Sequence, residues 1–219
     1  SVIRGSSFEE NPLSSSLVVS REGRELGRLT VPAPGRHNAL NALAVVAVGL
    51  ELDLSFEAVS GALARFVPAR RRFEWIVNAG ERFVISDYAH HPTEIRAVVQ
   101  TALKLGHRRV IAVYQPHRYT RTKALGPDFP PAFEGLHELV LAPVYEASES
   151  PIEGGTSRDL LQHFQKFGRV PVHYMDSLAS SWDYLKSVLR PGDLLMVIGA
   201  GDVEKIAFWG KKEFAQTER

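Results

Sequence analysis

The chain of 219 residues contains no cysteine. Disulfide bonds, thiolate catalysis and cysteine-ligated zinc or iron–sulfur sites are therefore excluded. No signal-peptide pattern opens the sequence, and no apolar run approaches the roughly 18–20 residues that cross a membrane. The net charge is +1, so bulk charge favours neither nucleic acid nor a membrane surface as the partner. We therefore expect a soluble cytoplasmic protein, and the 44% of apolar residues suits a chain that buries a core.

Several common catalytic motifs are also missing. The sequence has no Gly-x-x-x-x-Gly-Lys-Ser/Thr phosphate loop, no Gly-x-Ser-x-Gly and no His-Glu-x-x-His. A Gly-Ala-Gly-Asp stretch at 199–202 resembles half of a dinucleotide-binding motif, but the third glycine and the later acidic residue are absent. We interpret it as a tight turn from a strand to a helix, so the motifs alone predict no complete catalytic machine.

The part of the chain up to residue 72 has the pattern of a β-hairpin followed by two helices. Residues 1–16 are polar and Ser-rich, and we expect a loop or an irregular edge there. Two short β-like runs flank Gly23, which suits the positive φ of a tight turn. The Ala- and Val-rich run that follows predicts a helix buried on nearly every side, with Asn38 as its N-cap. Apolar spacing predicts a second helix at 55–66.

From residue 73 onward, apolar strand patterns alternate with helical ones. Strands are predicted near 74–78, 82–87, 109–114, 138–142, 170–174 and 193–198. Helices are predicted near 93–105, 128–135, 157–167, 177–190 and 202–209, followed by a frayed polar end from residue 211. Strands that alternate with helices of this length imply βαβ units. The fold class is therefore α/β, with a mostly parallel sheet and helices on both faces.

Polar side chains follow two of the predicted strands, at the point where each strand ends. Residues 87–91 bring an Asp, a Tyr and two His, and residues 115–122 bring a His and two Arg, Arg118 and Arg121. Ligands of open α/β sheets bind at the carboxyl ends of the strands. Guanidinium groups bind carboxylates and phosphates through two parallel hydrogen bonds. We expect the two strands to be neighbours, so that these residues form one cationic, hydrogen-bonding pocket for an anionic small molecule.

Each of these motifs also has a purely structural interpretation. Residues 87–91 would then be a surface loop that caps the next helix, and Arg118 and Arg121 would be a solvated basic turn. Adjacent His90 and His91 point in different directions, so at most one faces a given ligand, and we expect no metal site. The cations at 70–72 would be a solvated linker or would reach a polyphosphate.

Six blocks of sequence, in one order, resemble the Mur ligase family. The four most informative are Gly-Arg-His-Asn-Ala-Leu-Asn-Ala (35–42), Arg-Arg-Phe-Glu (71–74), Asp-Tyr-Ala-His-His-Pro-Thr-Glu (87–94) and Gln-Pro-His-Arg-Tyr-Thr-Arg-Thr (115–122). Two further blocks, at 144–149 and 199–202, agree with them. The resemblance covers about residues 16 to 209.

The resemblance implies a domain organisation. Family members have a UDP-binding domain, a central ATP-binding domain with a P-loop and a C-terminal Rossmann-like domain. Residues 1–72 would then be the C-terminal fragment of the central domain, and residues 73–219 the amino-acid-binding C-terminal domain. The UDP-binding domain and the P-loop would be missing, so we expect a fragment that is inactive alone and whose partners are the missing N-terminal domains.

The resemblance also implies a reaction, an amide formation driven by ATP and Mg²⁺ through an acyl phosphate. The block at 115–122 favours the branch that joins L-alanine to UDP-N-acetylmuramate in peptidoglycan synthesis. The alternative within the family is the branch that joins a tripeptide to the same sugar nucleotide during muropeptide recycling. The alternative from another class is a non-catalytic module that binds an anion or a nucleotide.

Roles on the nucleotide side carry over to four positions of this sequence. Asn38 and Asn41 would face the adenine, and a side-chain amide is suited to a purine edge. Arg72 would approach the phosphates, and Asp87 the ribose or the nucleotide side. The magnesium ligands of the family lie mainly in the missing segment, so no metal ligand is assigned.

Roles on the amino-acid side carry over to the two strand ends. Tyr88 and His90 would be the catalytic residues that line the acyl-phosphate site, and His90 would also contact the amino acid. Arg118 and Arg121 would bind the alanine carboxylate. Ser86 departs from the family, which often has a second Asp there, so the resemblance implies no role that needs paired carboxylates at this position.

Overall fold

The computed structural model describes residues 2–217, and the chain forms two compact units, residues 1–70 and 71–219. The division lies between Arg70 and Arg71, close to the domain boundary expected after residue 72. That the first unit is the end of an ATP-binding domain stays a prediction. Among the described residues, no helix combines the length and apolarity needed to cross a membrane.

A three-stranded antiparallel sheet forms one layer of the first unit. Its order is β1 (Ile3–Asn11), β2 (Ser14–Arg21) and β3 (Arg24–Val31). The predicted hairpin is confirmed, since Glu22 and Gly23 join β2 to β3 with φ of 51° and 86°. Of the two alternatives expected at 1–16, the loop is wrong and the irregular edge is confirmed, because β1 is an edge strand whose pairing with β2 is interrupted between Ser6 and Glu9. Most of β1 is exposed, so its sequence lacks the alternation of apolar and polar residues by which a strand is predicted. Its backbone hydrogen bonds to β2 form the strand.

Two helices, α1 (Arg36–Glu51) and α2 (Phe56–Ala64), pack on this sheet through a small apolar core. The N-cap of α1 is Gly35 and not Asn38, whose side-chain amide donates to the Pro34 carbonyl at 2.7 Å. The prediction that α1 is buried on nearly every side is also wrong. Ala42 and Val46 are buried, whereas apolar side chains on the rest of its surface are 49–60% exposed: Leu40, Val45 and Val48.

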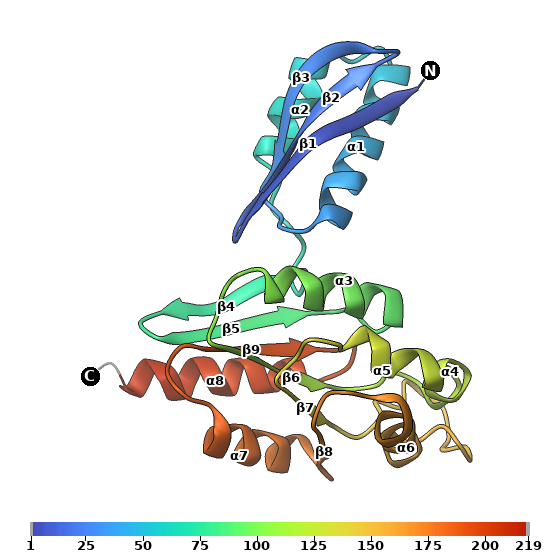
Figure 1. Ribbon diagram of the computed structural model, residues 1–219, viewed down its shortest axis with the longest axis vertical. Helices are drawn as coiled ribbons and strands as arrows, with labels where there is room; N and C mark the ends of the chain where they lie inside the picture. The colour runs from blue at the N-terminus through green and yellow to red at the C-terminus, as the bar shows by residue number, and fades with distance from the viewer. Residues whose placement is uncertain (1, 218–219) are drawn as a thin grey trace. The chain divides into compact units, whose positions relative to one another are not determined.

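The second unit is built on a six-stranded sheet of order β4-β5-β9-β6-β7-β8, in which β4 is antiparallel to β5 and the other pairs are parallel. Figure 1 shows this sheet with helices on both faces, which confirms the predicted α/β fold class. The strands are β4 (Glu74–Ala79), β5 (Arg82–Asp87), β6 (Arg109–Tyr114), β7 (Glu138–Leu141), β8 (Val172–Tyr174) and β9 (Asp193–Ile198). The helices are α3 (Pro92–Leu103), α4 (Tyr119–Leu125), α5 (Phe129–Ala132), α6 (Ser157–Phe167), α7 (Leu178–Val188) and α8 (Glu204–Thr217), with a 3₁₀ turn at Gly126–Asp128.

The core of this unit has one part on each face of the sheet. Side chains of α3, α5 and α6 pack on one face, with Tyr114, Phe129 and Phe133 among the largest buried groups. Side chains of α7 and α8, including Trp182, pack on the other face. Strand β9 is buried along its whole length, as expected for a central strand of a parallel sheet covered on both sides.

Four details differ from the predicted elements and their order. Strands β5 and β6 are not neighbours, because β9 lies between them. Helix α4 was not predicted, and the predicted helix at 128–135 is reduced to a 3₁₀ turn and the short α5, where Pro130 and Pro131 cannot continue a helical hydrogen-bond pattern. The last helix extends to Thr217 rather than fraying from residue 211, while residues 218–219 lie outside the described part.

Candidate active site

Asp87 ends β5 and fixes the loop that follows it. Its side chain is 4% exposed, and its two oxygens accept the backbone N–H groups of Phe73 at 2.8 Å and Ala89 at 2.7 Å. Burial raises the pKa of Asp87 to about 6, although the two donated hydrogen bonds and the charge of Arg72 act in the opposite direction. Asp87 therefore ties the segment before β4 to the loop that carries Tyr88 and His90.

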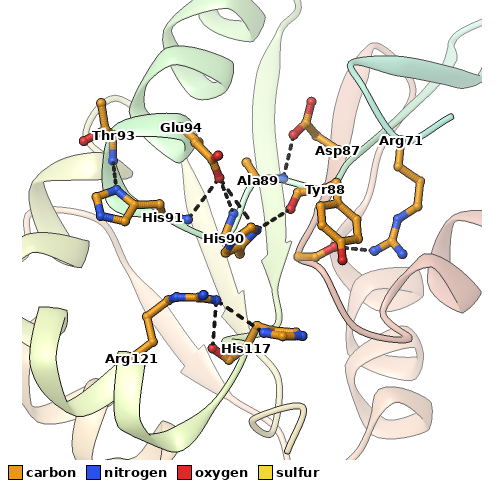
Figure 2. Close-up of polar contacts among 11 residues, drawn as sticks. Arg71, Asp87, Tyr88, Ala89, His90, His91, Thr93, Glu94, His117 and Arg121 are labelled. Atoms are coloured by element: carbon orange, nitrogen blue, oxygen red, sulfur yellow. Dashed lines mark hydrogen bonds and ion pairs between the residues drawn. The ribbon is translucent and has the colours of Figure 1, made fainter. Parts of the chain in front are cut away.

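His91 and Glu94 begin helix α3 as a capping pair. The His91 ring accepts the Thr93 N–H at 3.3 Å, and the Glu94 carboxylate accepts the N–H groups of His90 and His91 at 3.1 and 3.3 Å. Pro92 is the first residue of the helix, where its missing N–H has no cost. The interpretation of this segment as a capping network is confirmed for His91, and Figure 2 shows that its ring points away from the His90 ring.

The Arg71 guanidinium holds Tyr88 from the other side of the loop. It lies over the Tyr88 ring, 4.9 Å from the ring centroid, and donates to the Gly199 carbonyl. The Arg71 carbonyl also accepts the Tyr88 N–H at 2.8 Å. Figure 2 shows these groups on the side of the loop opposite His91. Arg71 therefore joins the end of β5 to the turn after β9.

The imidazole rings of His90 and His117 lie close together, with centroids 5.8 Å apart and ring planes tilted by 48° (Figure 2). His90 Nδ1 lies 3.1 Å from the Tyr88 carbonyl, which only accepts, so this nitrogen carries the proton and Nε2 presents a lone pair when the ring is neutral. His117 Nδ1 lies 3.3 Å from a guanidinium nitrogen of Arg121, which only donates, so the His117 proton sits on Nε2. One ring thus presents an acceptor and the other a donor.

Charge and burial keep His117 neutral. Burial lowers the pKa of His117, and the neighbouring charges of Arg121, His90 and Arg118 lower it further. The Arg121 guanidinium also donates to the His117 carbonyl at 3.3 Å, so it is fixed beside the ring (Figure 2). The Arg118 side chain is half exposed and lies 3.9 Å from Glu149. The site therefore combines a neutral imidazole with two guanidinium groups.

A glycine in the turn after β9 leaves room for Gln115 and for Tyr145, which packs on His117. The turn after β9 contains Gly199 and Gly201, and the Tyr145 ring stacks on His117 with centroids 5.5 Å apart. A Cβ on Gly201 would lie 2.4 Å from Gln115 Oε1 and 2.5 Å from Tyr145 Cγ. Gln115 cannot move aside freely, because its amide donates to Asp202 at 3.0 Å and accepts the Val203 N–H at 3.0 Å.

We therefore expect Gly201→Ala to lower the free energy of unfolding by about 2 kcal/mol, a typical cost of overpacking. Chemical denaturation followed by circular dichroism measures the change. Gly210→Ala is the matched control, because its Cβ would be 3.5 Å from the nearest atom, inside helix α8. Alanine favours a helix more than glycine does, so the free energy of unfolding should rise by up to about 1 kcal/mol. Equal stability of the Gly201→Ala variant and the unsubstituted chain would show that the turn tolerates a side chain.

Of the residues assigned from the sequence, Tyr88, His90 and Arg121 meet around His117 in the second unit (Figure 2). Arg72 is exposed and acts on Asp87 through its charge. Asn38 and Asn41 belong to the first unit. The amide of Asn38 is used by Pro34, and Asn41 is exposed rather than turned into the helix core.

Several residues of the site were not assigned from the sequence. Arg71 lay in a run of three cations, and nothing in the run distinguishes the one that turns inward. Glu94 stands at the third position of a helix after a Pro, which is a recognisable capping signal. Tyr145 and Glu149 belong to a block that matches the family, but no local pattern connects them to residues about 30 positions earlier in the chain.

Comparison with known proteins supports the sequence resemblance. Residues 71–201 match the family model described as Mur ligase, glutamate ligase domain. A UDP-N-acetylmuramate–L-alanine ligase of Desulfosudis oleivorans is 45% identical over 183 residues, which are 83% of this chain and 40% of the relative. The enzyme of that name in Salinibacter ruber is 41% identical over 202 residues, 92% of this chain and 42% of the relative. The chain therefore spans less than half the length of these relatives.

Solved structures share the fold at lower identity. A crystal structure of UDP-N-acetylmuramate–alanine ligase from Thermotoga maritima aligns with a TM-score of 0.81 at 24% identity, covering 98% of this chain and 46% of that one. A murein peptide ligase from Psychrobacter arcticus aligns with a TM-score of 0.63 at 19% identity, covering 95% and 44%.

Proposed function

This chain belongs to the Mur ligase family, and from that membership we propose that it supplies the amino-acid half of the active site of an ATP-dependent ligase. The ligase joins L-alanine to UDP-N-acetylmuramate in peptidoglycan synthesis. The observation that carries the proposal is the meeting of His90, His117 and Arg121 at the carboxyl ends of β5 and β6 (Figure 2). These groups suit a small zwitterion and a developing negative charge.

The proposed roles follow from the donors and acceptors described above. Arg118 and Arg121 bind the carboxylate of the amino acid, because guanidinium groups match its two oxygens. His90, with the Nε2 lone pair, receives a proton from the amine as it attacks the acyl phosphate. His117, as a neutral donor, and Tyr88 line the same site. The amine displaces phosphate, and the new bond is an amide.

The roles proposed on the nucleotide side come from family membership. We propose that Asn38 and Asn41 face the adenine and that Arg72 approaches the phosphates. Asp87 contributes to the nucleotide side mainly by fixing the segments 71–73 and 88–90. Magnesium would neutralise phosphate charge during transfer. The described residues contain no group of three or more His, Asp or Glu side chains suited to a metal ion.

The test is an assay of the intact gene product that contains this sequence. Incubation with ATP, Mg²⁺, L-alanine and UDP-N-acetylmuramate should release one phosphate for each alanylated sugar nucleotide, measured by phosphate release and mass spectrometry. The 219-residue chain alone should release none, because it has no Gly-x-x-x-x-Gly-Lys-Ser/Thr loop to hold the phosphates. Turnover by this chain alone would contradict that division of roles.

Two results would replace the proposal with one of its alternatives. Faster turnover with the tripeptide than with L-alanine, at the same sugar-nucleotide concentration, would identify the muropeptide-recycling branch. The intact gene product could instead bind nucleotide and form no amide, while its circular dichroism spectrum shows that it is folded. That result would favour a non-catalytic binding module.

A further inference from the structure

Glu149 provides the N-terminal end of helix α4 with acceptors that its own N-cap residue lacks. The N-cap residue is Arg118, which makes no side-chain capping hydrogen bond. Glu149 accepts the Thr120 backbone N–H at 3.0 Å and the Thr120 hydroxyl at 2.7 Å, across 29 residues of sequence. Unsatisfied N–H groups at the start of a helix need such partners. The position of the first turn of α4 therefore depends on Glu149.

The same carboxylate faces the guanidinium of Arg118. Glu149 Oε1 lies 3.9 Å from Arg118 NH1, which is near enough for attraction between opposite charges and too far for a hydrogen bond. The Arg118 side chain is 50% exposed. Its donors therefore remain available to a second carboxylate while the charge of Glu149 attracts the guanidinium.

The backbone on both sides of this contact is held in unusual conformations. Arg118 has a φ of 73°, and Ala147 and Ser148 have φ of 49° and 69°. Two hydrogen bonds join the segments: Arg118 N–H donates to the Tyr145 carbonyl at 2.9 Å, and Tyr145 N–H donates to the Pro116 carbonyl at 2.8 Å. Positive φ at residues other than glycine persists where surrounding contacts enforce it, often beside functional groups.

We propose that Glu149 is a positioning residue that orients Arg118 toward the carboxylate of the incoming amino acid, an inference that rests on the proposed ligase function. Glu149 acts through the first turn of α4 and through its charge, and it does not contact the substrate. The hydroxyl and N–H of Thr120, with the charge of Arg118, hold the pKa of Glu149 below its usual range against the opposing effect of desolvation. The carboxylate is therefore ionised at neutral pH.

The kinetic test uses Glu149→Ala and Glu149→Gln in the intact gene product. We expect Glu149→Ala to raise the KM for L-alanine about tenfold, with kcat and the KM for ATP within about twofold of the unsubstituted enzyme. Glu149→Gln keeps an oxygen for Thr120 but loses the charge, so an increase of about threefold is expected. Glu153→Ala is the control, because Glu153 is exposed in the same loop and should leave all constants unchanged.

A second measurement does not depend on activity. In NMR spectra of the 219-residue chain, the chemical shift of the Arg118 Nε–H group should differ from that of a free arginine. In Glu149→Ala it should move to the free-arginine value. An unchanged KM for L-alanine, an equal loss in every kinetic constant, or an unmoved resonance would each overturn the role of Glu149. An intact gene product that is inactive with L-alanine while the resonance still moves would instead overturn the ligase function and leave Glu149 as an anchor of Arg118.

Discussion

Replacing Arg118 by alanine in the intact gene product should lower kcat/KM for L-alanine by about 100- to 1,000-fold, equivalent to about 3–4 kcal/mol. The guanidinium is half exposed and lies 3.9 Å from Glu149, too far for a hydrogen bond, so its N–H groups can bind the carboxylate of the amino acid through two hydrogen bonds. Because that contact exists before and during the reaction, most of the loss should be an increase in the KM for L-alanine. Steady-state kinetics at varied L-alanine concentration measures it.

Two further variants separate this effect from a loss of folding. Alanine keeps the Cβ at a position with φ of 73°, so the backbone strain is similar, and Arg118→Ala should unfold at nearly the same denaturant concentration. Arg118→Lys keeps the charge without the planar fork, so an intermediate loss is expected. Arg169→Ala removes an arginine that is 84% exposed and paired with Glu134 at 3.2 Å, and it should retain full activity. Unchanged alanine kinetics in Arg118→Ala would refute the carboxylate-binding role.

The stability of the chain should carry a pH dependence that originates at Asp87. In the folded chain, burial raises the pKa of this carboxyl group from its ordinary value of 3.8 to about 6. Between these two pH values the folded chain keeps the proton and the unfolded chain does not. The stabilisation is therefore complete below about pH 4 and is lost as the pH rises through about 6, which amounts to about 3 kcal/mol.

This expectation is checked by two measurements. The ¹³C resonance of the Asp87 carboxyl group should titrate with a midpoint near 6. The free energy of unfolding, measured with denaturant between about pH 4 and 7, should fall more with rising pH in the unsubstituted chain than in Asp87→Asn. Subtracting the two curves removes the contribution of all other titrating groups. A midpoint at or below the ordinary value would mean that the N–H groups of Phe73 and Ala89 outweigh burial.

The alternation of strands and helices after residue 73 was predictable because each element has a local signal. Strands such as β6 and β9 are short apolar runs, and helices such as α3 begin with a capping residue and a proline. Strand β1 and helix α4 had no such signal. The first is an exposed edge strand, and the second begins at Arg118, whose side chain does not cap it. Strand β1 is stabilised by pairing with β2, the next strand in the chain, and the first turn of α4 by Glu149, 29 residues later.

What the sequence determined by itself is the chemistry available to the site. It supplied the imidazole and guanidinium groups at two strand ends, and the family to which their order belongs. Only the tertiary structure decided which of these groups meet. Strand order placed β9 between β5 and β6, the ring of His90 nevertheless lies 5.8 Å from that of His117, and Gly201 leaves room for Tyr145, which stacks on His117. Pairing between strands and contacts such as that of Glu149 with Thr120 join residues far apart in the chain, and local sequence patterns carry no record of such distances.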